Sequence, residues 1–183
     1  ARRAWNLAVD QRPAVVALPR SVDDVVDAVD YARTLGLRIA VQGTGHGAPH
    51  TSLDGTMLVN TARMTGVEVD PKGRTARVAA GTIWADVVDA AVPHGLTALH
   101  GSAHDVGVVG YSLGGGIGWL GRKHGLSSSS VLSAQVVTAE GEILRVPDGL
   151  SLRDAALAEP LAVALHGITN SGIVPGERAL VLG

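Results

Sequence analysis

The chain of 183 residues contains no cysteine and no phenylalanine. Without cysteine it can form no disulfide, use no thiol nucleophile and bind no metal through sulfur. It has no run of about 18 uncharged apolar residues, so we expect no membrane-spanning helix. No signal-peptide pattern follows the first residues, and the sequence therefore predicts a soluble, cytoplasmic protein.

The chain also lacks an excess of charge of either sign. Fifteen Lys and Arg residues face 17 Asp and Glu residues, which leaves a formal net charge of −2. A nucleic-acid-binding domain usually carries a clear basic excess, so a nucleic-acid partner is not expected. The hydrophobic fraction of 46% excludes a mainly disordered chain. We therefore expect a folded protein whose partner is a small-molecule substrate, with neither nucleic acid nor membrane involved.

The first third of the sequence has the pattern of a β-α-β unit. The apolar run at residues 14–18 lies between two prolines, as is typical of a short buried strand. Ser21 is a good helix N-cap, and apolar residues then recur at helical spacing until Gly36, which fits a helix end. A second strand is predicted at residues 37–41.

The rest of the pattern predicts further strands, a hairpin and two helices. Two alternating segments flank the turn Pro71-Lys72-Gly73, which is typical of a β-hairpin. The predicted strands and helices are a strand at 57–60, hairpin strands at 66–70 and 75–79, a helix that begins within 81–84 and stops near Pro93, strands at 131–139 and 143–146, a helix at 151–166 and a strand at 178–182.

Glycine is abundant, with 24 residues, and two segments are dense in it. We call residues 42–47 the first loop and residues 101–118 the second loop. The three glycines of the first loop would let several backbone N–H groups point at one anion, as in phosphate-binding nests, with His46 at the tip. A tight turn with an exposed histidine is the alternative for this loop.

The second loop has seven glycines in eighteen residues. A surface loop would be more polar than one containing Val106, Val108, Val109 and Leu113, so the pattern predicts a buried loop. We interpret it as backbone packed around a large, flat, partly charged ligand. The alternative is a glycine-rich turn followed by a closely packed helix.

Together the two loops resemble a known family. The residues that carry the resemblance are Trp5-Asn6, 43–47, 107–120 and 122–126. They are similar to the FAD-binding domain of the vanillyl-alcohol oxidase / p-cresol methylhydroxylase superfamily, and especially to berberine-bridge-enzyme-like oxidases, over residues 1–146. The resemblance implies an α+β fold, a truncated two-lobed (PCMH-type) FAD-binding domain at 1–148. Its lobes would lie at about 1–62 and 63–148, with the flavin between them.

The resemblance also assigns residues to FAD. It implies that the first loop wraps the pyrophosphate and that His46 bonds covalently to the flavin 8α-methyl group. It implies that the second loop lines the isoalloxazine and the diphosphate, and that Val136 and Val137 lie at the adenine end. The implied cofactor-binding residues are Gln42, Gly43, Thr44, Gly45, His46, Gly47, Gly101, Ser102, Asp105, Val106, Gly107, Gly110, Tyr111, Gly114, Gly115, Gly116, Gly118, Val136 and Val137.

The chain departs from the family pattern in the two loops. Family members with two flavin bonds have a cysteine at the position of Ala103, so only one bond, through His46, is expected here. Gln42 and Thr44 replace the commoner Arg and Gly of the first loop. The implied chemistry is hydride transfer from an alcohol- or sugar-type substrate to the flavin, with dioxygen as the acceptor. No catalytic residue is assigned, because the domain that supplies it in the family is missing from the resemblance.

The C-terminal segment, residues 149–183, resembles another family, the zinc-dependent medium-chain alcohol dehydrogenases. Glu159 matches a carboxylate near that family's catalytic zinc, and Gly183 matches its first Rossmann glycine. The other zinc ligands are absent. Two alternatives to an oxidase domain therefore stay open: a non-catalytic flavin-binding module or inactive fused fragment, and a dehydrogenase remnant.

Two histidine pairs have the spacing of zinc ligands on a helix. They are His46/His50 and His100/His104. Both pairs lie in segments rich in Gly, Ser or Pro, where a helix is not expected. No metal site is therefore predicted.

Overall fold

The structure is a computed structural model, and it describes residues 1–48 and 52–145. By its contacts the chain divides into two compact units. The first contains residues 1–131 and 135–144. All helices and strands described below lie in this unit, apart from Arg145 at the end of strand β7. The second contains residues 132–134 and 145–183. His50, the dehydrogenase-like segment and the predicted helix and strand at 151–166 and 178–182 lie outside the described residues.

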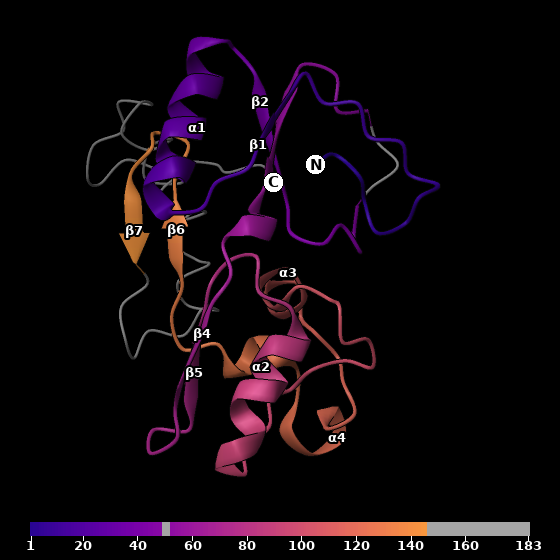
Figure 1. Cartoon of the computed structure of the whole chain (residues 1–183), viewed down its shortest axis with the longest axis vertical. Coiled ribbons are helices and arrows are strands. Elements are labelled where there is room, and N and C mark those ends of the chain that lie inside the picture. Colours follow the sequence, from indigo (N-terminus) through magenta and orange to yellow (C-terminus); the bar gives the residue numbers. More distant parts are fainter. Residues whose placement is uncertain (49–51, 146–183) are drawn as a thin grey trace, which may run out of the picture. The chain divides into compact units, whose positions relative to one another are not determined.

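A three-stranded parallel sheet follows the N-terminal segment (Figure 1). Its strands are β1 (Val15–Ala17), β2 (Arg38–Gln42) and β3 (Thr56–Asn60), in the order β1-β3-β2. Helix α1 (Val22–Thr34) connects β1 to β2. The predicted β-α-β unit is confirmed, and β3 occupies the place between its two strands.

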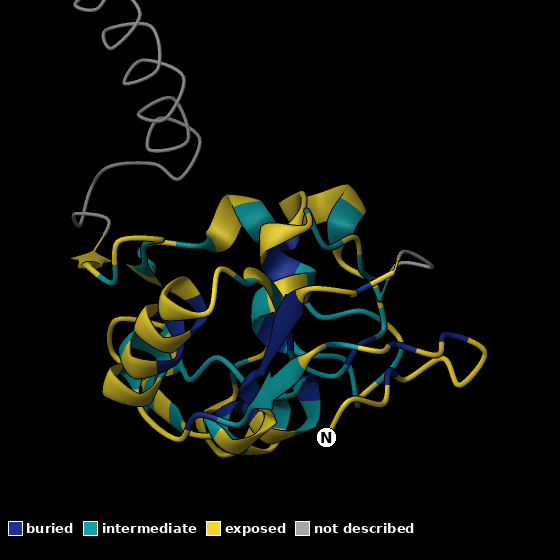
Figure 2. Ribbon diagram, turned by 90° about the horizontal axis from the view of Figure 1, so that it is seen from above, coloured by how far each residue is buried: buried dark blue, intermediate teal, exposed yellow. Residues whose placement is uncertain are grey.

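The central strand β3 is buried along its whole length (Figure 2). Met57 and Val59 pack with Ala28 and Ala32 of α1 in one hydrophobic cluster. A parallel strand covered on both faces reads as a continuous apolar run, and the sequence Met-Leu-Val at the centre of β3 fits that rule.

The start of α1 is stabilised by a capping box. The Ser21 hydroxyl accepts from the Asp24 amide at 3.1 Å, and the Asp24 carboxylate accepts from the amides of Arg20 and Ser21 at 2.7 and 3.3 Å. The Arg20 amide in particular lowers the pKa of Asp24. The helix ends before Gly36, whose φ of 63° is the left-handed conformation that glycine adopts without cost. Both predicted ends of the helix are confirmed.

A second hydrophobic cluster lies among the later elements. The antiparallel hairpin of β4 (Val67–Asp70) and β5 (Thr75–Val78) contributes Val67 and Val78, helix α2 (Trp84–Ala91) contributes Trp84, and α3 (Val108–Leu113) contributes Val108. The remaining elements are the 3₁₀ turns η1 (Thr61–Arg63), η2 (Val92–His94) and η3 (Ser127–Ser130), the helix α4 (Gly121–His124) and the paired strands β6 (Gln135–Val137) and β7 (Ile143–Arg145).

This set of helices and small separate sheets confirms the expected α+β class. Two details differ from the sequence prediction. The second loop is not a continuous buried loop, because it contains α3 and exposes Leu113 and Ile117. The strand predicted at 131–139 is shorter, since β6 has three residues.

Gly81 lies against the backbone of Thr61, near the predicted boundary of the lobes at about 1–62 and 63–148. A Cβ added there would lie 1.9 Å from the carbonyl oxygen of Thr61, so only glycine permits this approach of two backbones. The Thr61 hydroxyl also donates to the Ala80 carbonyl at 3.1 Å. The lobe boundaries themselves stay a prediction. None of the helices in residues 1–48 and 52–145 has the length and apolar run needed to cross a bilayer.

Candidate functional site

The first loop begins where β2 ends, beside the end of β3. Gln42 and Asn60 are register partners at this edge. Gln42 Nε2 donates to the Arg3 carbonyl at 3.1 Å, and Asn60 Nδ2 donates to the Ala1 carbonyl at 2.9 Å. Ligands of open α/β sheets bind outside the carboxyl ends of the strands. The two amides therefore hold the N-terminal segment, residues 1–5, at the edge where a ligand is expected.

Gly45 lets the N-terminal segment lie directly against the first loop. Its φ is 81°, and an added Cβ would lie 2.8 Å from Ala4 Cα and 3.1 Å from the Trp5 nitrogen. Packing and backbone conformation therefore both require glycine here. The next residue, His46, has a side chain that is 20% exposed, so the alternative of a turn with an exposed histidine is not borne out.

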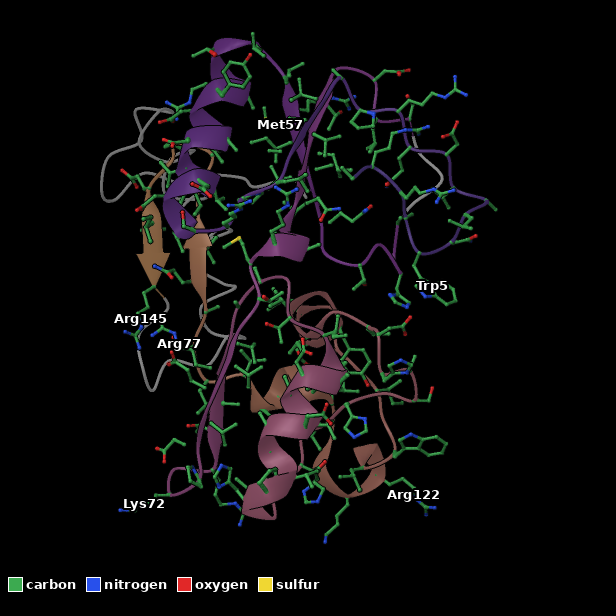
Figure 3. All side chains as sticks on the ribbon, viewed as in Figure 1. Trp5, Met57, Lys72, Arg77, Arg122 and Arg145 are labelled. Carbon is green, nitrogen blue, oxygen red and sulfur yellow. The ribbon has the colours of Figure 1, made fainter. Side chains whose placement is uncertain are left out.

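Side chains from three separate segments surround His46. The Trp5 ring, labelled in Figure 3, stacks on the imidazole with the ring centroids 4.6 Å apart and the planes 23° apart. Thr44 Oγ1 lies 2.7 Å from Nδ1. Nε2 lies 3.6 Å from Asp105 Oδ1, is buried, and makes no hydrogen bond within the described part of the chain. Nδ1 is thus hydrogen-bonded with Thr44. Nε2 is held near the Asp105 carboxylate, beyond ordinary hydrogen-bond distance.

Asp105 belongs to the second loop, and Trp5 orients its carboxylate. Trp5 Nε1 donates to Asp105 Oδ2 at 2.9 Å. This hydrogen bond is the main cause that lowers the pKa of Asp105, and the nearby His46 and His104 lower it further. The carboxylate is therefore ionised at neutral pH, next to the imidazole.

The backbone around Asp105 is fixed by the start of α2. The amides of Trp84 and Ala85 donate to the carbonyls of Val106 and His104 at 3.0 and 2.9 Å. Gly107 forms an antiparallel bridge with Ile83. The first amides of a helix have no partner within the helix, and here they bind the backbone on both sides of Asp105. The position of the Asp105 backbone therefore does not depend on its side chain.

The rest of the second loop is packed around Tyr111. This ring meets Trp84 edge to face at 5.6 Å, and its hydroxyl donates to the Ile117 carbonyl. Burial raises the pKa of Tyr111, so the phenol stays protonated as that donor. An added Cβ would lie 2.5 Å from the Tyr111 ring at Gly116, and 2.0 Å from the His100 carbonyl oxygen at Gly118. These two glycines are therefore required by contacts within the protein.

The structure brings some predicted site residues together. Thr44 and His46 meet Gly107 and Asp105, since an added Cβ on Gly107 would lie 3.7 Å from the Thr44 side chain. Val136 and Val137 lie on β6, which contacts α1. The cofactor contacts of all these residues stay predictions.

Sequence reasoning missed the role of Trp5. In the sequence Trp5 stands out only as part of a motif, and its hydrogen bond to Asp105 spans 100 positions of the chain. No periodicity or spacing in a single sequence signals such a contact.

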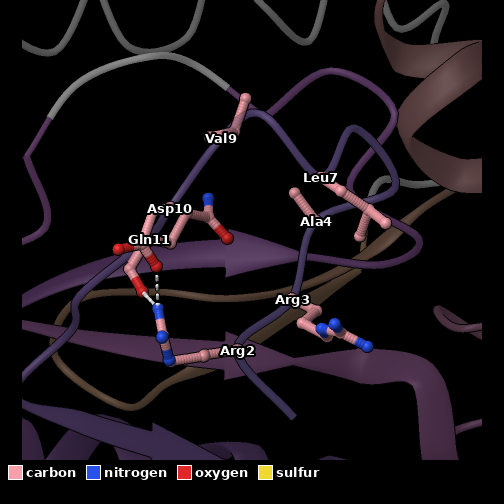
Figure 4. A pocket seen from close by; sticks show the side chains of 7 residues that line it. All are labelled: Arg2, Arg3, Ala4, Leu7, Val9, Asp10 and Gln11. Atoms are coloured by element: carbon pink, nitrogen blue, oxygen red, sulfur yellow. Dashed lines mark hydrogen bonds and ion pairs between the residues drawn. The ribbon is translucent and has the colours of Figure 1, made fainter.

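Two cavities in the described part of the chain lie away from the first and second loops. One, of about 240 Å³, lies within the N-terminal segment (Figure 4). Arg2 and Arg12 lower the pKa of Asp10 there, and Arg2 also donates to the Gln11 carbonyl, so its guanidinium is already engaged. This volume is below the roughly 300–1,000 Å³ of small-molecule sites. The other cavity is lined by Thr65, Gly66, Val67, Asp86 and Asp89, and its two carboxylates would repel a phosphate.

Of the two histidine pairs, only His100 and His104 lie wholly within the described residues. Residues 100–104 form no helix, as predicted, and His100 Nδ1 lies 2.7 Å from the Gly101 carbonyl oxygen. Across residues 1–48 and 52–145, no group of three or more His, Asp or Glu side chains is arranged to hold a metal ion.

The comparisons with known proteins agree on one family. Residues 13–147 match the family "FAD binding domain". The chain is 37% identical to (R)-6-hydroxynicotine oxidase of Paenarthrobacter nicotinovorans over 145 residues, which cover 79% of this chain and 32% of the relative. It is 34% identical to glucooligosaccharide oxidase of Sarocladium strictum over 149 residues, which cover 79% of this chain and 30% of that protein.

Solved structures give the same result. The crystal structure of 6-hydroxy-D-nicotine oxidase from Arthrobacter nicotinovorans superposes with a TM-score of 0.75 at 35% identity, covering 79% of this chain and 32% of that one. A structure of glucooligosaccharide oxidase from Acremonium strictum, described as carrying a 6-S-cysteinyl, 8α-N1-histidyl FAD, gives 0.73 at 33% identity, with 79% and 31% covered.

The fold and loops define an FAD-binding domain of the PCMH type. The chain belongs to the family of FAD-linked oxidoreductases that includes the berberine-bridge-enzyme-like proteins, and its cofactor is FAD. It spans about a third of the length of the relatives it matches, 32% in the case of the nicotine oxidase.

The residues of the site fit a flavin. The imidazole of His46 is held by three side chains in a loop at the ligand-binding edge of the sheet. In the described part of the chain, no atom lies within 4 Å of an added Cβ at Gly47 or Gly110, so both loops leave space beside their backbone. The first loop would hold the cofactor through His46 and its backbone amides, and the second through its backbone.

Proposed function

We propose that this chain is the flavin-binding domain of an FAD-linked oxidase and that His46 forms a single covalent bond to the flavin. The observation that supports the proposal is the enclosure of His46 between Trp5, Thr44 and Asp105, in a chain of the FAD-binding family. An imidazole held on three sides is oriented for bond formation at a fixed point. When bound, FAD supplies the hydride acceptor for substrate oxidation.

The covalent attachment balances with dioxygen as oxidant. An imidazole nitrogen of His46 bonds to the 8α carbon, and one hydrogen leaves each partner. The two electrons and two protons pass to dioxygen, which becomes hydrogen peroxide. In this step His46 of the first loop supplies the nucleophile.

A second flavin bond is excluded by composition. The glucooligosaccharide oxidase structure is described with both a cysteinyl and a histidyl link. This chain has no cysteine, and Ala103 stands at the corresponding position in the family resemblance. The attachment through His46 is therefore single.

The proposed reaction of the whole protein is oxidation of an alcohol- or sugar-type substrate with dioxygen as acceptor. The supporting observation is that relatives at 34% and 33% identity are named glucooligosaccharide and chitooligosaccharide oxidases. No substrate base is assigned, because the chain spans about a third of such relatives. A non-catalytic flavin-binding module is the competing proposal, and it predicts bound FAD without peroxide release.

The test is the fate of flavin colour after acid precipitation. The full chain is incubated with FAD in air and precipitated, and the pellet is expected to remain yellow. His46→Ala should release all flavin to the supernatant, while His94→Ala, an exposed histidine of η2, should behave like the parent. A pellet that stays yellow in His46→Ala would refute the assigned attachment, and a protein that takes up no FAD would refute flavin binding by this chain.

A further inference from the structure

Three segments far apart in the sequence converge on one imidazole. Trp5 comes from the N-terminal segment, Thr44 from the first loop and Asp105 from the second loop. Trp5 is both the stacking partner of His46 and the donor to Asp105, so its single ring sets the orientation of the other two groups. The proposed function gives His46 a covalent bond, but it assigns no task to Asp105 or Trp5.

The contacts distinguish the two neutral forms of the imidazole. With the hydrogen on Nδ1, the lone pair of Nε2 would face the Asp105 carboxylate at 3.6 Å, and both atoms would be acceptors. With the hydrogen on Nε2, an N–H faces the carboxylate, and the Thr44 hydroxyl donates to Nδ1 at 2.7 Å. Because Nε2 is buried, a facing pair of acceptors is costly. The second form avoids that pair, places the Nε2 hydrogen toward the carboxylate at 3.6 Å and keeps the hydrogen bond of Nδ1 with Thr44.

We infer that Asp105, oriented by Trp5, is a positioning residue that keeps the hydrogen of His46 on Nε2 and leaves the lone pair on Nδ1. Nδ1 is then the nitrogen that attacks the flavin 8α carbon. This inference rests on the proposed function for the identity of the reaction. The tautomer itself is a property of the protein without flavin.

Before flavin binds, the reacting nitrogen Nδ1 is hydrogen-bonded to Thr44. The Thr44 hydroxyl donates to Nδ1, so this hydrogen bond must break before Nδ1 forms a bond to carbon. Thr44→Gly removes the donor, so in that variant no hydrogen bond to Nδ1 has to break.

Asp105→Asn gives the sharpest test, because Trp5 should fix the orientation of the new amide. Trp5 Nε1 needs an acceptor, so the Asn oxygen takes that contact and its NH₂ group faces His46 Nε2. A donor facing Nε2 favours the opposite tautomer, with the hydrogen on Nδ1. The same substitution in the catalytic triad of a serine protease leaves the geometry intact and gives the wrong tautomer.

The first readout is ¹⁵N NMR of the His46 ring in the full chain without FAD, at about pH 8, above the ordinary histidine pKa. We expect hydrogen-bearing Nε2 and hydrogen-free Nδ1 in the parent, and the reverse in Asp105→Asn. Asp54→Asn removes a carboxylate before β3, at the end of the sheet opposite the first loop, and should leave the signals unchanged. A parent ring with its hydrogen on Nδ1, or an Asp105→Asn ring like the parent, would overturn the inference.

The second readout is the rate of acid-stable flavin attachment. Asp105→Asn is expected to slow it by about 10- to 100-fold, the range found when a metal-binding histidine loses the partner that orients it. Adding Trp5→Phe to Asp105→Asn frees the amide to turn and should restore part of the rate. Attachment in Asp105→Asn at the parent rate would contradict the inference. If the parent attaches no flavin, the proposed function fails instead, and the NMR result still decides the tautomer.

Discussion

The two glycine-rich loops have the same compositional character but need their glycines for different reasons. In the first loop, Gly45 admits the N-terminal segment and so brings Trp5 onto His46. In the second loop, Gly116 and Gly118 admit Tyr111 and the His100 carbonyl, which belong to the same part of the chain. The first loop thus presents a side chain, and the second packs upon itself.

The difference shows how far glycine content indicates a ligand site. An added Cβ at Gly118 would collide with protein atoms, while the space at Gly47 and Gly110 is open in the described part of the chain. Only glycines beside open space, such as Gly47 and Gly110, leave room for a cofactor near the backbone. Glycine density therefore indicates close approach, and the structure is needed to say whether protein or ligand makes it.

The largest expected difference concerns the two tryptophans that lie against the loops. Trp84, beneath the second loop, is 4% exposed, whereas Trp5, over the first, is 58% exposed. Trp84→Ala is expected to lower the free energy of unfolding by about 3–5 kcal/mol, because it empties a core position. Trp5→Ala should cost only about 1 kcal/mol, for one stacking contact and one hydrogen bond. Urea unfolding measures both, and equal losses would contradict this account of the two loops.

Within the second loop, Gly118 and Gly110 form a matched pair. Gly118→Ala places a Cβ 2.0 Å from the His100 carbonyl oxygen. The overpacking should cost about 3 kcal/mol. Gly110→Ala, inside α3 and in open space, should be neutral or stabilising by up to about 1 kcal/mol, since alanine favours helix. Urea midpoints test the pair, and a tolerated Gly118→Ala would show that the loop does not pack on His100.

Within the first loop, Gly45 and Gly47 form the corresponding pair. Gly45→Ala combines a φ of 81° with contacts of 2.8 and 3.1 Å to the N-terminal segment, and should cost about 2 kcal/mol. Gly47→Ala meets no atom of the described chain within 4 Å and should change stability by less than about 0.5 kcal/mol. Thermal or urea unfolding distinguishes them. A Gly47→Ala loss as large as that of Gly45→Ala would show that packing governs the whole loop.

The smallest expected effect is a pH dependence of the contact between Trp5 and Asp105. The pKa of Asp105 lies below its ordinary value, mainly because of the Trp5 hydrogen bond. The contact therefore stabilises the fold above the unfolded pKa of about 3.9 and is lost as pH falls through the lower, folded pKa. The groups facing the carboxylate are Trp5, His46 and His104. The Trp5 indole N–H signal should shift in this acidic range while that of Trp84 does not. A Trp5 signal constant down to acid unfolding would contradict the contact.

Local sequence patterns predicted most of the fold. The capping residues of α1, the apolar run of β3 and the turn between β4 and β5 all determine their elements through neighbours in the chain. The helix α3 entered only as the alternative for the second loop, because glycine-rich segments carry little local preference. The short length of β6 was not predicted.

The candidate site was predictable only in part. His46 and both loops follow from the motif resemblance. The convergence of Trp5, Thr44 and Asp105 on His46 does not, because these contacts depend on packing between segments up to 100 residues apart. The C-terminal segment resembles a dehydrogenase, and that resemblance stays a prediction outside the described residues.

The central claim is that the first loop binds the flavin through a side chain and the second through its backbone. Peptide mass spectrometry of the full chain, incubated with FAD in air, tests it most directly. We predict one modified peptide, heavier by one FAD less two hydrogens, with the modification on His46. Bound FAD that dissociates completely in acid, or a modification on a residue of the second loop, would contradict the claim.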